Sequence, residues 1–332
     1  MANVTYVLGI DGGGTHARAL LATRDGTPVA EGWGGPANFQ AVGEEVTRAS
    51  VEQAIAAALA AAPGGPLPRT AVAAMAAGLA GMHVQADYQR FTAVAQQVLP
   101  HSKIRIYNDG EVALAAATGG REGIVVVAGT GSIAFGQGPT GVYMRCGGWG
   151  YLIGDEGSAY AITRSALRAA SYADDGRAAP STLCTAFAEA LDVPTLDDIL
   201  RPVYGPPTMT RHQLAALAPL VARCAAGGDA AALAVLAEAG QDLATMPIAL
   251  AGKLGLGGQP FPVACSGGVW QAGQPVLVPF TRRVLAAYPR AVIGPPLLHP
   301  AAGAALLAID LLHGGHDQAT VQRLRAAPGG VA

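Results

Sequence analysis

The sequence predicts an α/β protein made of two similar halves, each with a mixed sheet and flanking helices. Three observations lead to this prediction. A set of three short strands, with a glycine-rich turn after the first strand, occurs twice along the chain. Alternating helices and strands follow each set, and a helical segment interrupts the second half. The 332 residues suffice for two lobes, and a cleft between such lobes is a natural ligand site.

The first half begins with three short segments of apolar, β-favouring residues that are separated by glycine-containing turns. They predict strands at 4–10, 17–22 and 28–33. Longer Ala-rich or amphipathic segments then alternate with short apolar ones, which favours helices alternating with strands. These elements are helix 44–62, strand 70–77, helix 85–99 and strand 103–107.

The second half repeats this order. Strands are predicted at 123–128, 133–136 and 142–146, followed by a helix at 158–171 and a helical insertion at about 181–254. The remaining elements are strand 262–265, helix 275–288, strand 291–293 and a helix from residue 301. We therefore predict an N-terminal lobe of residues 1–113 and a C-terminal lobe of residues 114–300. The final helix is expected to pack back on the N-terminal lobe.

Composition and charge exclude several classes of protein. Apolar residues make up 51% of the chain and charged residues 13%, which is typical of a globular protein. A net charge of −2 indicates no surface for nucleic acid. No apolar stretch is read as long enough to span a bilayer, and the N-terminus has no basic segment of a signal peptide, so a cytoplasmic protein with no membrane partner is expected. The cysteines are widely spaced and form no CxxC pair, which argues against a disulfide framework, a zinc site or an intrachain iron–sulfur cluster. They are Cys146, Cys184, Cys224 and Cys265.

Three glycine-containing turns each follow a predicted strand. They are Gly12-Gly13-Gly14-Thr15 after Asp11, Gly129-Thr130-Gly131-Ser132, and Ser266-Gly267-Gly268. Glycines let backbone N–H groups approach a phosphate closely, and an Asp before such a turn can hold Mg²⁺ through water. Each of the first two turns, read alone, is equally a simple hairpin. The order of all three on a repeated architecture favours nucleotide binding, although neither a P-loop nor a dinucleotide fingerprint is present.

Two polar clusters are candidates for catalysis and binding. Asn108-Asp109-Gly110 suits a turn, but at the end of a strand its carboxylate could accept a proton from an attacking hydroxyl. Farther along, Trp149 is flanked by glycines and followed by Asp155 and Glu156, which suits a sugar platform with carboxylates for sugar hydroxyls. Alternatively, the indole is a core residue and the two acids begin a helix. The residue types leave both readings open.

Together these segments resemble the N-acetylglucosamine kinase branch of the BadF/BadG/BcrA/BcrD ATPase family, in the ASKHA superfamily. The resemblance spans nearly the whole chain, and its most specific part is the run GGWGYLIGDEGSAY. It implies the two-lobed actin/hexokinase-like (ribonuclease H-like) fold with a cleft between the lobes. It also implies an ATP- and Mg²⁺-dependent kinase that acts on the 6-hydroxyl of N-acetylglucosamine or glucosamine, and a homodimer.

The resemblance further implies residue roles. Asp109 would be the catalytic base, Asp11 would lie near Mg²⁺, and Ala80-Gly81 would lie at the cleft. The implied ATP-binding residues are Gly12, Gly13, Gly14, Thr15, Gly129, Thr130, Gly131, Ser132, Gly267 and Gly268. The implied sugar-binding residues are Asn38, Asn108, Thr130, Gly148, Trp149, Asp155 and Glu156. His16 departs from the family pattern, in which Lys or a small polar residue is common, and is expected to be a cleft-rim or strand residue.

Two other functions are weighed against this one. An ATPase activator of a reductive dehydratase, known in the same family, holds an iron–sulfur cluster between subunits, but no second cysteine accompanies Cys146. A non-catalytic sugar- or nucleotide-binding regulator would need a DNA-binding appendage, and neither a basic helix-turn-helix nor a cysteine-rich zinc motif is visible. The presence of Asp109 favours an enzyme. Among sugars, N-acetylglucosamine, glucosamine, N-acetylmuramic acid and hexoses all stay open.

Overall fold

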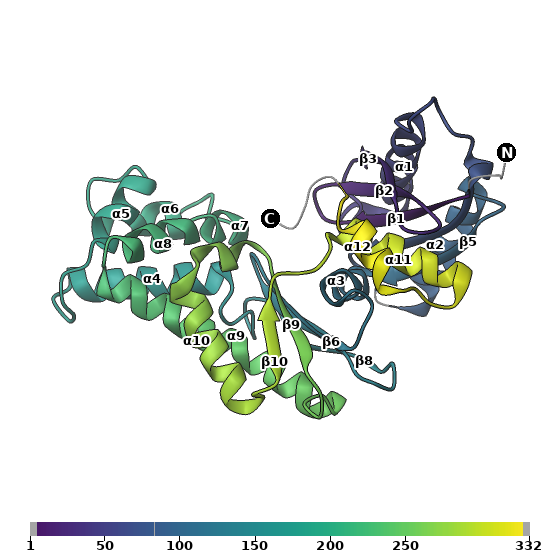
Figure 1. The fold of residues 1–332 in the computed structure, drawn as a ribbon. Helices are drawn as coiled ribbons and strands as arrows, with labels where there is room; N and C mark the ends of the chain where they lie inside the picture. Colours follow the sequence, from purple (N-terminus) through teal and green to yellow (C-terminus); the bar gives the residue numbers. More distant parts are fainter. Residues whose placement is uncertain (1–4, 83, 328–332) are drawn as a thin grey trace. The chain divides into compact units, whose positions relative to one another are not determined.

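The chain divides into two compact units in the computed structural model, which describes residues 5–82 and 84–327 (Figure 1). Unit 1 consists of Met1–Glu122 and Pro295–Ala332, and unit 2 of Gly123–Gly294. Each unit contains a five-stranded mixed sheet with flanking helices, so the predicted fold class is confirmed. The predicted boundary between residues 113 and 114 falls inside a helix, α3 (Asp109–Thr118), that belongs wholly to unit 1. The chain instead leaves unit 1 after this helix and returns at residue 295.

The sheet of unit 1 has the strand order β3-β2-β1-β4-β5. Its strands are β1 (Tyr6–Gly12), β2 (Ala17–Thr23), β3 (Pro28–Gly34), β4 (Val72–Leu79) and β5 (Lys103–Asn108). The first three strands form an antiparallel meander, whereas β4 and β5 run parallel to β1. Gly12 pairs with Leu79, and Leu79 pairs with Asn108, so these three strands end level with one another. Loops that follow them therefore meet at one edge of the sheet.

Helices cover both faces of this sheet, which explains why its strands are nearly continuous apolar runs. One face packs against α1 (Phe39–Ala60) and α2 (Gln85–Val98). The other packs against α3, α11 (Pro300–His313) and α12 (Gln318–Leu324). A short 3₁₀ turn at Arg69–Ala71 precedes β4.

The returning helix α11 lies directly against the backbone of β1. A Cβ atom at Gly9 would be 2.1 Å from the backbone nitrogen of Ala305 and 2.2 Å from the carbonyl oxygen of Ala301. A Cβ at Gly303 would likewise meet Ala116 of α3 at 2.6 Å. The helix can come this close because its inner side is built almost entirely of alanine and glycine. Small residues thus set the distance between helix and sheet.

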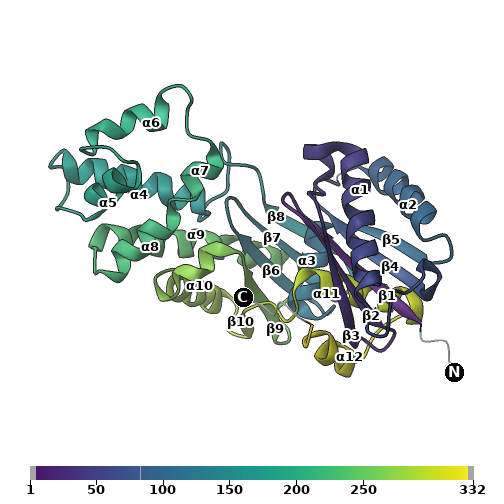
Figure 2. The ribbon, with the colours of Figure 1, turned by 90° about the horizontal axis from the view of Figure 1, so that it is seen from above.

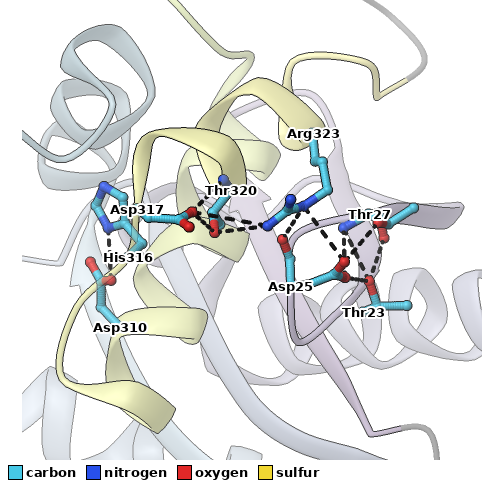
Figure 3. A network of polar contacts seen from close by, with 8 residues as sticks. All are labelled: Thr23, Asp25, Thr27, Asp310, His316, Asp317, Thr320 and Arg323. Carbon is cyan, nitrogen blue, oxygen red and sulfur yellow. Dashed lines mark hydrogen bonds and ion pairs between the residues drawn. The ribbon is translucent and has the colours of Figure 1, made fainter.

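Polar contacts hold the segment that follows α11 (Figure 3). His316 lies 2.8 Å from the carboxylate of Asp310 through Nδ1 and 3.0 Å from the carbonyl of Gly119 through Nε2. Because both ring nitrogens face acceptors, the charged imidazolium satisfies both, and the hydrogen bond to Asp310 raises the pKa of His316. In α12, Arg323 reaches the turn between β2 and β3, where it donates to the backbone oxygen of Asp25 and pairs with its carboxylate. These contacts fix the C-terminal helices to the β2–β3 hairpin and to Gly119 after α3.

Unit 2 repeats the sheet topology of unit 1, with the strand order β10-β9-β6-β7-β8. Its strands are β6 (Gly123–Ala128), β7 (Ser132–Gln137), β8 (Tyr143–Gly147), β9 (Phe261–Ser266) and β10 (Ala291–Gly294). Again three strands form an antiparallel meander and two run parallel to the first. The predicted architectural repeat is therefore present in the described residues.

The helices of unit 2 include the predicted insertion, and α4–α8 gather to one side of the sheet (Figure 2). They are α4 (Ala159–Asp174), α5 (Leu183–Ala190), α6 (Leu200–Tyr204), α7 (Arg211–Ala215), α8 (Ala218–Ala226), α9 (Ala230–Leu254) and α10 (Gln274–Ala287), with 3₁₀ turns at Asp197–Ile199 and Gly268–Ala272. Contrary to the expectation from sequence, α9 is long and apolar enough to cross a membrane by length and composition. However, half of its apolar window is buried, and it packs on α10 and the sheet, as a core helix does.

Two helices of the structure, α3 and α12, are absent from the elements that the sequence predicts. The Asn108-Asp109-Gly110 tripeptide is predicted as a strand end or turn, but Asn108 is the N-cap of α3. Glu111 accepts a hydrogen bond from the backbone of Asn108, which completes a capping box before an Ala-rich run. That Asn-x-x-Glu spacing was a readable helix signal. The other missed helix, α12, is only seven residues long and depends on the contacts of Arg323.

Gly9→Ala is expected to destabilise unit 1 by about 1–3 kcal/mol or more, because a methyl group there would collide with the backbone of α11. Urea unfolding followed by circular dichroism measures the change. Gly315→Ala is the matched control, since nothing lies within 4 Å of its Cβ position, and it should change stability by less than about 0.5 kcal/mol. Equal stability of the two variants would contradict the close packing of α11 on β1.

His299 gives the stability of unit 1 a predictable pH dependence. This buried N-cap of α11 accepts a hydrogen bond from the backbone of Ala302 at 3.3 Å, and burial, with Arg18 nearby, lowers its pKa from 6.5 to about 4. Below pH 6.5 the imidazole of His299 therefore binds a proton in the unfolded chain but stays neutral in the folded chain until the pH approaches about 4. The resulting stability is complete above pH 6.5 and is lost as the pH falls towards about 4.

His299→Asn keeps an N-cap side chain but removes the titrating ring. Between pH 7 and pH 4 the parent protein should lose roughly 2 kcal/mol more stability than this variant, after allowance for solvent screening. Urea unfolding at several pH values measures both curves. Parallel curves over this pH range would show that His299 does not cause the acid sensitivity.

Candidate active site

In unit 1, three loops are bonded to one another at the edge where the parallel strands end. Ala80 donates its N–H to the oxygen of Gly12 and Phe39 donates to the oxygen of Ala80, both at 2.9 Å. Ala37 donates to the oxygen of Gly13, also at 2.9 Å. The first glycine turn, the loop before α1 and the Ala80-Gly81 turn therefore form one connected surface. The structure brings these predicted site segments together.

Two carboxylates belong to this edge. Asp11 lies near the end of β1, and Asp109 is the first residue of α3, directly after β5. Burial and the charge of Asp109 raise the pKa of Asp11 to about 6, while Arg18 on the paired position of β2 opposes the shift. The charge of Asp109 thus makes ionisation of Asp11 less favourable, and a bound cation would relieve this repulsion. The carboxylate donors of Asp11 and Asp109 are thus of the type that could hold Mg²⁺ together with water.

Both predicted sugar-binding asparagines cap helices. The Oδ1 atom of Asn38 accepts from Ala41 at 3.1 Å at the start of α1, and that of Asn108 accepts from Gly110 at 2.9 Å. Asn108 also donates through Nδ2 to the oxygen of Met82 at 3.1 Å. Gly81 has a φ of +83°, and a Cβ there would be 2.7 Å from Oδ1 of Asn38. The caps therefore hold both amides at the same edge as the two carboxylates.

The first glycine turn is a hairpin with an open tip. Gly13 donates to the oxygen of His16 at 3.1 Å, and nothing lies within 4 Å of the Cβ position of Gly14. Thr15 and His16 are exposed and hydrogen-bonded to each other at 2.9 Å. The ring of His16 also lies 5.0 Å from that of Trp33. The turn is thus a hairpin, as one of the two interpretations expected. Its backbone at Gly14 is still accessible, so the hairpin does not prevent phosphate binding.

In unit 2, the second glycine turn is bonded to the loop that contains Trp149. Gly148 donates to the oxygen of Ser132 at 3.0 Å, and the hydroxyl of Ser132 donates to the oxygen of Glu156 at 2.7 Å. The backbone of Ser132 also donates to Oδ1 of Asp155 at 3.2 Å. The predicted phosphate turn and the predicted sugar loop are therefore one hydrogen-bonded assembly.

A cavity of about 520 Å³ opens beside the second turn. Its walls are mainly apolar side chains and glycine backbone, as in sites that take small molecules of drug or cofactor size. It is lined by Gly129, Thr130, Ala159, Ile162, His212, Ala215, Ala216, Ala218, Pro219, Ala222, Leu236, Gly268, Val269, Gln271 and Ala272. Gly267 has a φ of +103°, and a Cβ there would be 2.4 Å from the oxygen of Ala128, so only glycine fits. The second and third glycine turns thus meet at one cavity.

The loop between β8 and α4 exposes Trp149. Trp149 is 65% exposed, so the alternative that its indole is a core residue is wrong. The guanidinium of Arg145 lies 5.0 Å from the centre of the Trp149 ring. The other alternative, that Asp155 and Glu156 begin α4, is also wrong, because Ser158 caps that helix by accepting from Ala161. Asp155 is instead 4% exposed and has a φ of +62°.

Two further charged residues beside these loops are not predicted from any motif. Arg211, the first residue of α7, donates through Nη2 to Oδ2 of Asp155 at 2.9 Å. In unit 1, Arg18 donates to Glu31 at 2.6 Å. The first pair lies 56 positions apart in the chain, and only the packing of the insertion unites it.

No group of three or more His, Cys, Asp or Glu side chains in the described residues could hold a metal ion, and the four cysteines are free thiols. An iron–sulfur cluster bound within one chain therefore has no ligand set in the described part of the structure.

Comparison with known proteins gives consistent results. The chain is 29% identical over 310 residues to the N-acetyl-D-glucosamine kinase of Dictyostelium discoideum, covering 91% of this chain and 97% of that protein. It is 32% identical over 240 residues to the N-acetylmuramic acid/N-acetylglucosamine kinase of Clostridium acetobutylicum, covering 72% and 76%. A solved structure from Chromobacterium violaceum, provisionally described as an N-acetylglucosamine kinase, matches with a TM-score of 0.67 and 31% identity, covering 92% and 99%.

A glucokinase of the ROK family from Streptomyces griseus, at 16% identity and a TM-score of 0.53, shares the fold. The expected actin/hexokinase-like fold is therefore confirmed. The model of the BadF/BadG/BcrA/BcrD ATPase family matches residues 8–308, nearly the whole chain and all three glycine turns. The predicted resemblance is thus confirmed, and this chain belongs to the BadF/BadG/BcrA/BcrD ATPase family.

Proposed function

We propose that this protein is an ATP-dependent kinase that phosphorylates an amino sugar, with N-acetylglucosamine or glucosamine as the substrate. One observation carries the proposal: the second glycine turn opens onto a nucleotide-sized cavity and is hydrogen-bonded to the loop that exposes Trp149. A site for a nucleotide and a platform for a sugar are thus built on the same turn of unit 2. The names of the similar proteins, kinases of N-acetylglucosamine, N-acetylmuramic acid and glucosamine, support this substrate class.

The cavity of unit 2 accounts for the nucleotide. Adenosine would lie against Gly267 and Gly268, where backbone replaces side chains and a flat base can approach closely. The phosphates would be bound by N–H and hydroxyl groups of the two turns Gly12–Thr15 and Gly129–Ser132. Mg²⁺, held by Asp11 through water, would offset the charge of the phosphates.

The exposed indole of Trp149 accounts for the sugar. Leu152 and Ile153 of the same loop are exposed together with Trp149. Grouped exposed apolar side chains of this kind mark ligand sites, and a sugar ring can stack on an exposed indole. The polar groups that would complete this subsite are Asn38, Asn108, Thr130, Gly148, Asp155 and Glu156. Each carboxylate or amide oxygen can accept a second hydrogen bond, so the contacts seen within the protein do not prevent binding.

Asp109 is the proposed catalytic base. It accepts the proton of the sugar 6-hydroxyl, whose oxygen then forms a bond to the γ-phosphorus as the bond to the β-phosphate oxygen breaks and ADP leaves. Backbone donors of the two turns stabilise the charge that develops on the phosphoryl oxygens. The family resemblance implies a cytoplasmic homodimer, and we propose that its partner is the small-molecule sugar.

The kinase activity is tested by measuring ADP release with Mg-ATP on N-acetylglucosamine, glucosamine, N-acetylmuramic acid and glucose. We expect one of the amino sugars to give the highest kcat/KM, and the 6-deoxy form of that sugar to give no sugar-dependent ADP. Preference for glucose over all three amino sugars would refute the substrate class. Release of ADP that no sugar stimulates would refute the kinase activity.

Asp109→Asn should lower kcat by about 10²–10⁴-fold, because the amide cannot accept the proton of the attacking hydroxyl. Affinity for Mg-ATP, measured by titration calorimetry, should stay close to that of the parent protein. Asp87→Asn, the same change in the first turn of α2, is the control and should retain full turnover. A kcat for Asp109→Asn equal to that of the control would remove Asp109 from the mechanism.

A further inference from the structure

Arg211 joins the helical insertion of unit 2 to the second glycine turn. Its Nη2 donates to Oδ2 of Asp155 at 2.9 Å, and Oδ1 of the same carboxylate accepts the backbone N–H of Ser132 at 3.2 Å. The side chain of Asp155 is only 5% exposed, and that of Arg211 is 33% exposed. One buried carboxylate thus connects α7 with the backbone of the turn.

Arg211, Asp155 and the turn at Gly131 are packed tightly against one another. A Cβ atom at Gly131 would be 2.4 Å from Nη2 of Arg211 and 2.7 and 2.9 Å from the two carboxylate oxygens of Asp155. The guanidinium of Arg211 also lies 5.7 Å from the centre of the Tyr151 ring, on the loop that carries Trp149. The charged pair therefore fills the space beneath the turn and limits how the turn can move.

The backbone of Asp155 indicates that these contacts are maintained at a cost. Its φ of +62° lies in the left-handed region, which costs a non-glycine residue about 1–3 kcal/mol. Such a conformation persists where surrounding contacts hold it, and here they are the bonds to Ser132 and Arg211. Removal of the guanidinium would also leave a buried carboxylate without its partner.

The pair lies next to the nucleotide cavity. His212, the residue after Arg211, lines that cavity together with Gly129 and Thr130 of the turn. Ala215 of α7 and Ala216 extend this wall. The remaining walls come from α4, α8, α9, the third glycine turn and the 3₁₀ turn after it, so the end of the cavity at Gly268 is built from other elements than α7. A change at Arg211 can therefore disturb the phosphate end of the site and leave the adenosine end intact.

We propose that Arg211 is a positioning residue for the nucleotide: it holds Asp155 against Ser132 and so fixes the turn Gly129–Ser132 in the conformation that binds the phosphates of ATP. Arg211 acts through Asp155 and not by contact with ATP. The inference rests on the proposed function, because it takes this turn as the phosphate site. It assigns the helical insertion a part in nucleotide binding.

Titration calorimetry without sugar tests the proposal, with Mg-ATP and with adenosine as separate ligands. Arg211→Gln should weaken Mg-ATP binding about tenfold and change adenosine binding by less than about twofold. Arg211→Lys, which keeps the charge and one donor, should recover most of the loss. Arg223→Gln on α8 makes the same change at an exposed position of the insertion and should bind both ligands as the parent protein does.

A double-mutant cycle separates action through Asp155 from direct contact. Asp155→Asn should itself weaken Mg-ATP binding. Adding Arg211→Gln should cause no further loss, because the carboxylate through which Arg211 acts on Ser132 is already absent. Additive losses, equal weakening of adenosine, or unchanged Mg-ATP binding in Arg211→Gln would each overturn the proposal. Failure of the parent protein to bind Mg-ATP would overturn the proposed function together with it, whereas normal binding by both proteins overturns only the role of Arg211.

Discussion

Parallel strand pairing is the constraint on which the arrangement of the candidate site residues in each unit depends. In unit 1, β1, β4 and β5 end level with one another, so the loops after them are close enough for direct backbone bonds. In unit 2, β6 pairs in parallel with β9, and Gly267 after β9 lies against Ala128 at the end of β6. The same topology thus produces the same arrangement of loops twice. The proposed catalytic carboxylate of unit 1 and the proposed nucleotide cavity of unit 2 are each built on this plan.

Small residues make this plan compact enough to work. Gly9 lets α11 touch β1, and Gly303 lets the same helix touch α3. Since α3 begins at Asp109, this packing also fixes the position of the proposed base. The alanine-rich composition thus has a structural use in α11, where a larger side chain would lift the helix from the sheet and shift the residues at its edge.

Several charged groups near the candidate site residues interact with a charged neighbour. Asp11 is influenced by both Asp109 and Arg18, Arg18 bonds Glu31, and His299 stays neutral close to this pair. In unit 2, Asp155 and Arg211 form a corresponding pair beneath the second turn. Partly buried charges of this kind are costly without partners, so their pairs fix specific loop conformations more than they add stability.

The sequence by itself determined most of the element order, the architectural repeat, the three glycine turns and the family, because these depend on local residue patterns and their order along the chain. It located Asp109 but missed the capping box that makes this residue the start of a helix. It also left Trp149 undecided between core and surface, since a residue type does not reveal which side of a loop faces solvent. Only the tertiary structure decided that exposure and the pairing of Arg211 with Asp155. These features arise from contacts between segments distant in the chain, and such contacts are set by packing, which no local pattern encodes.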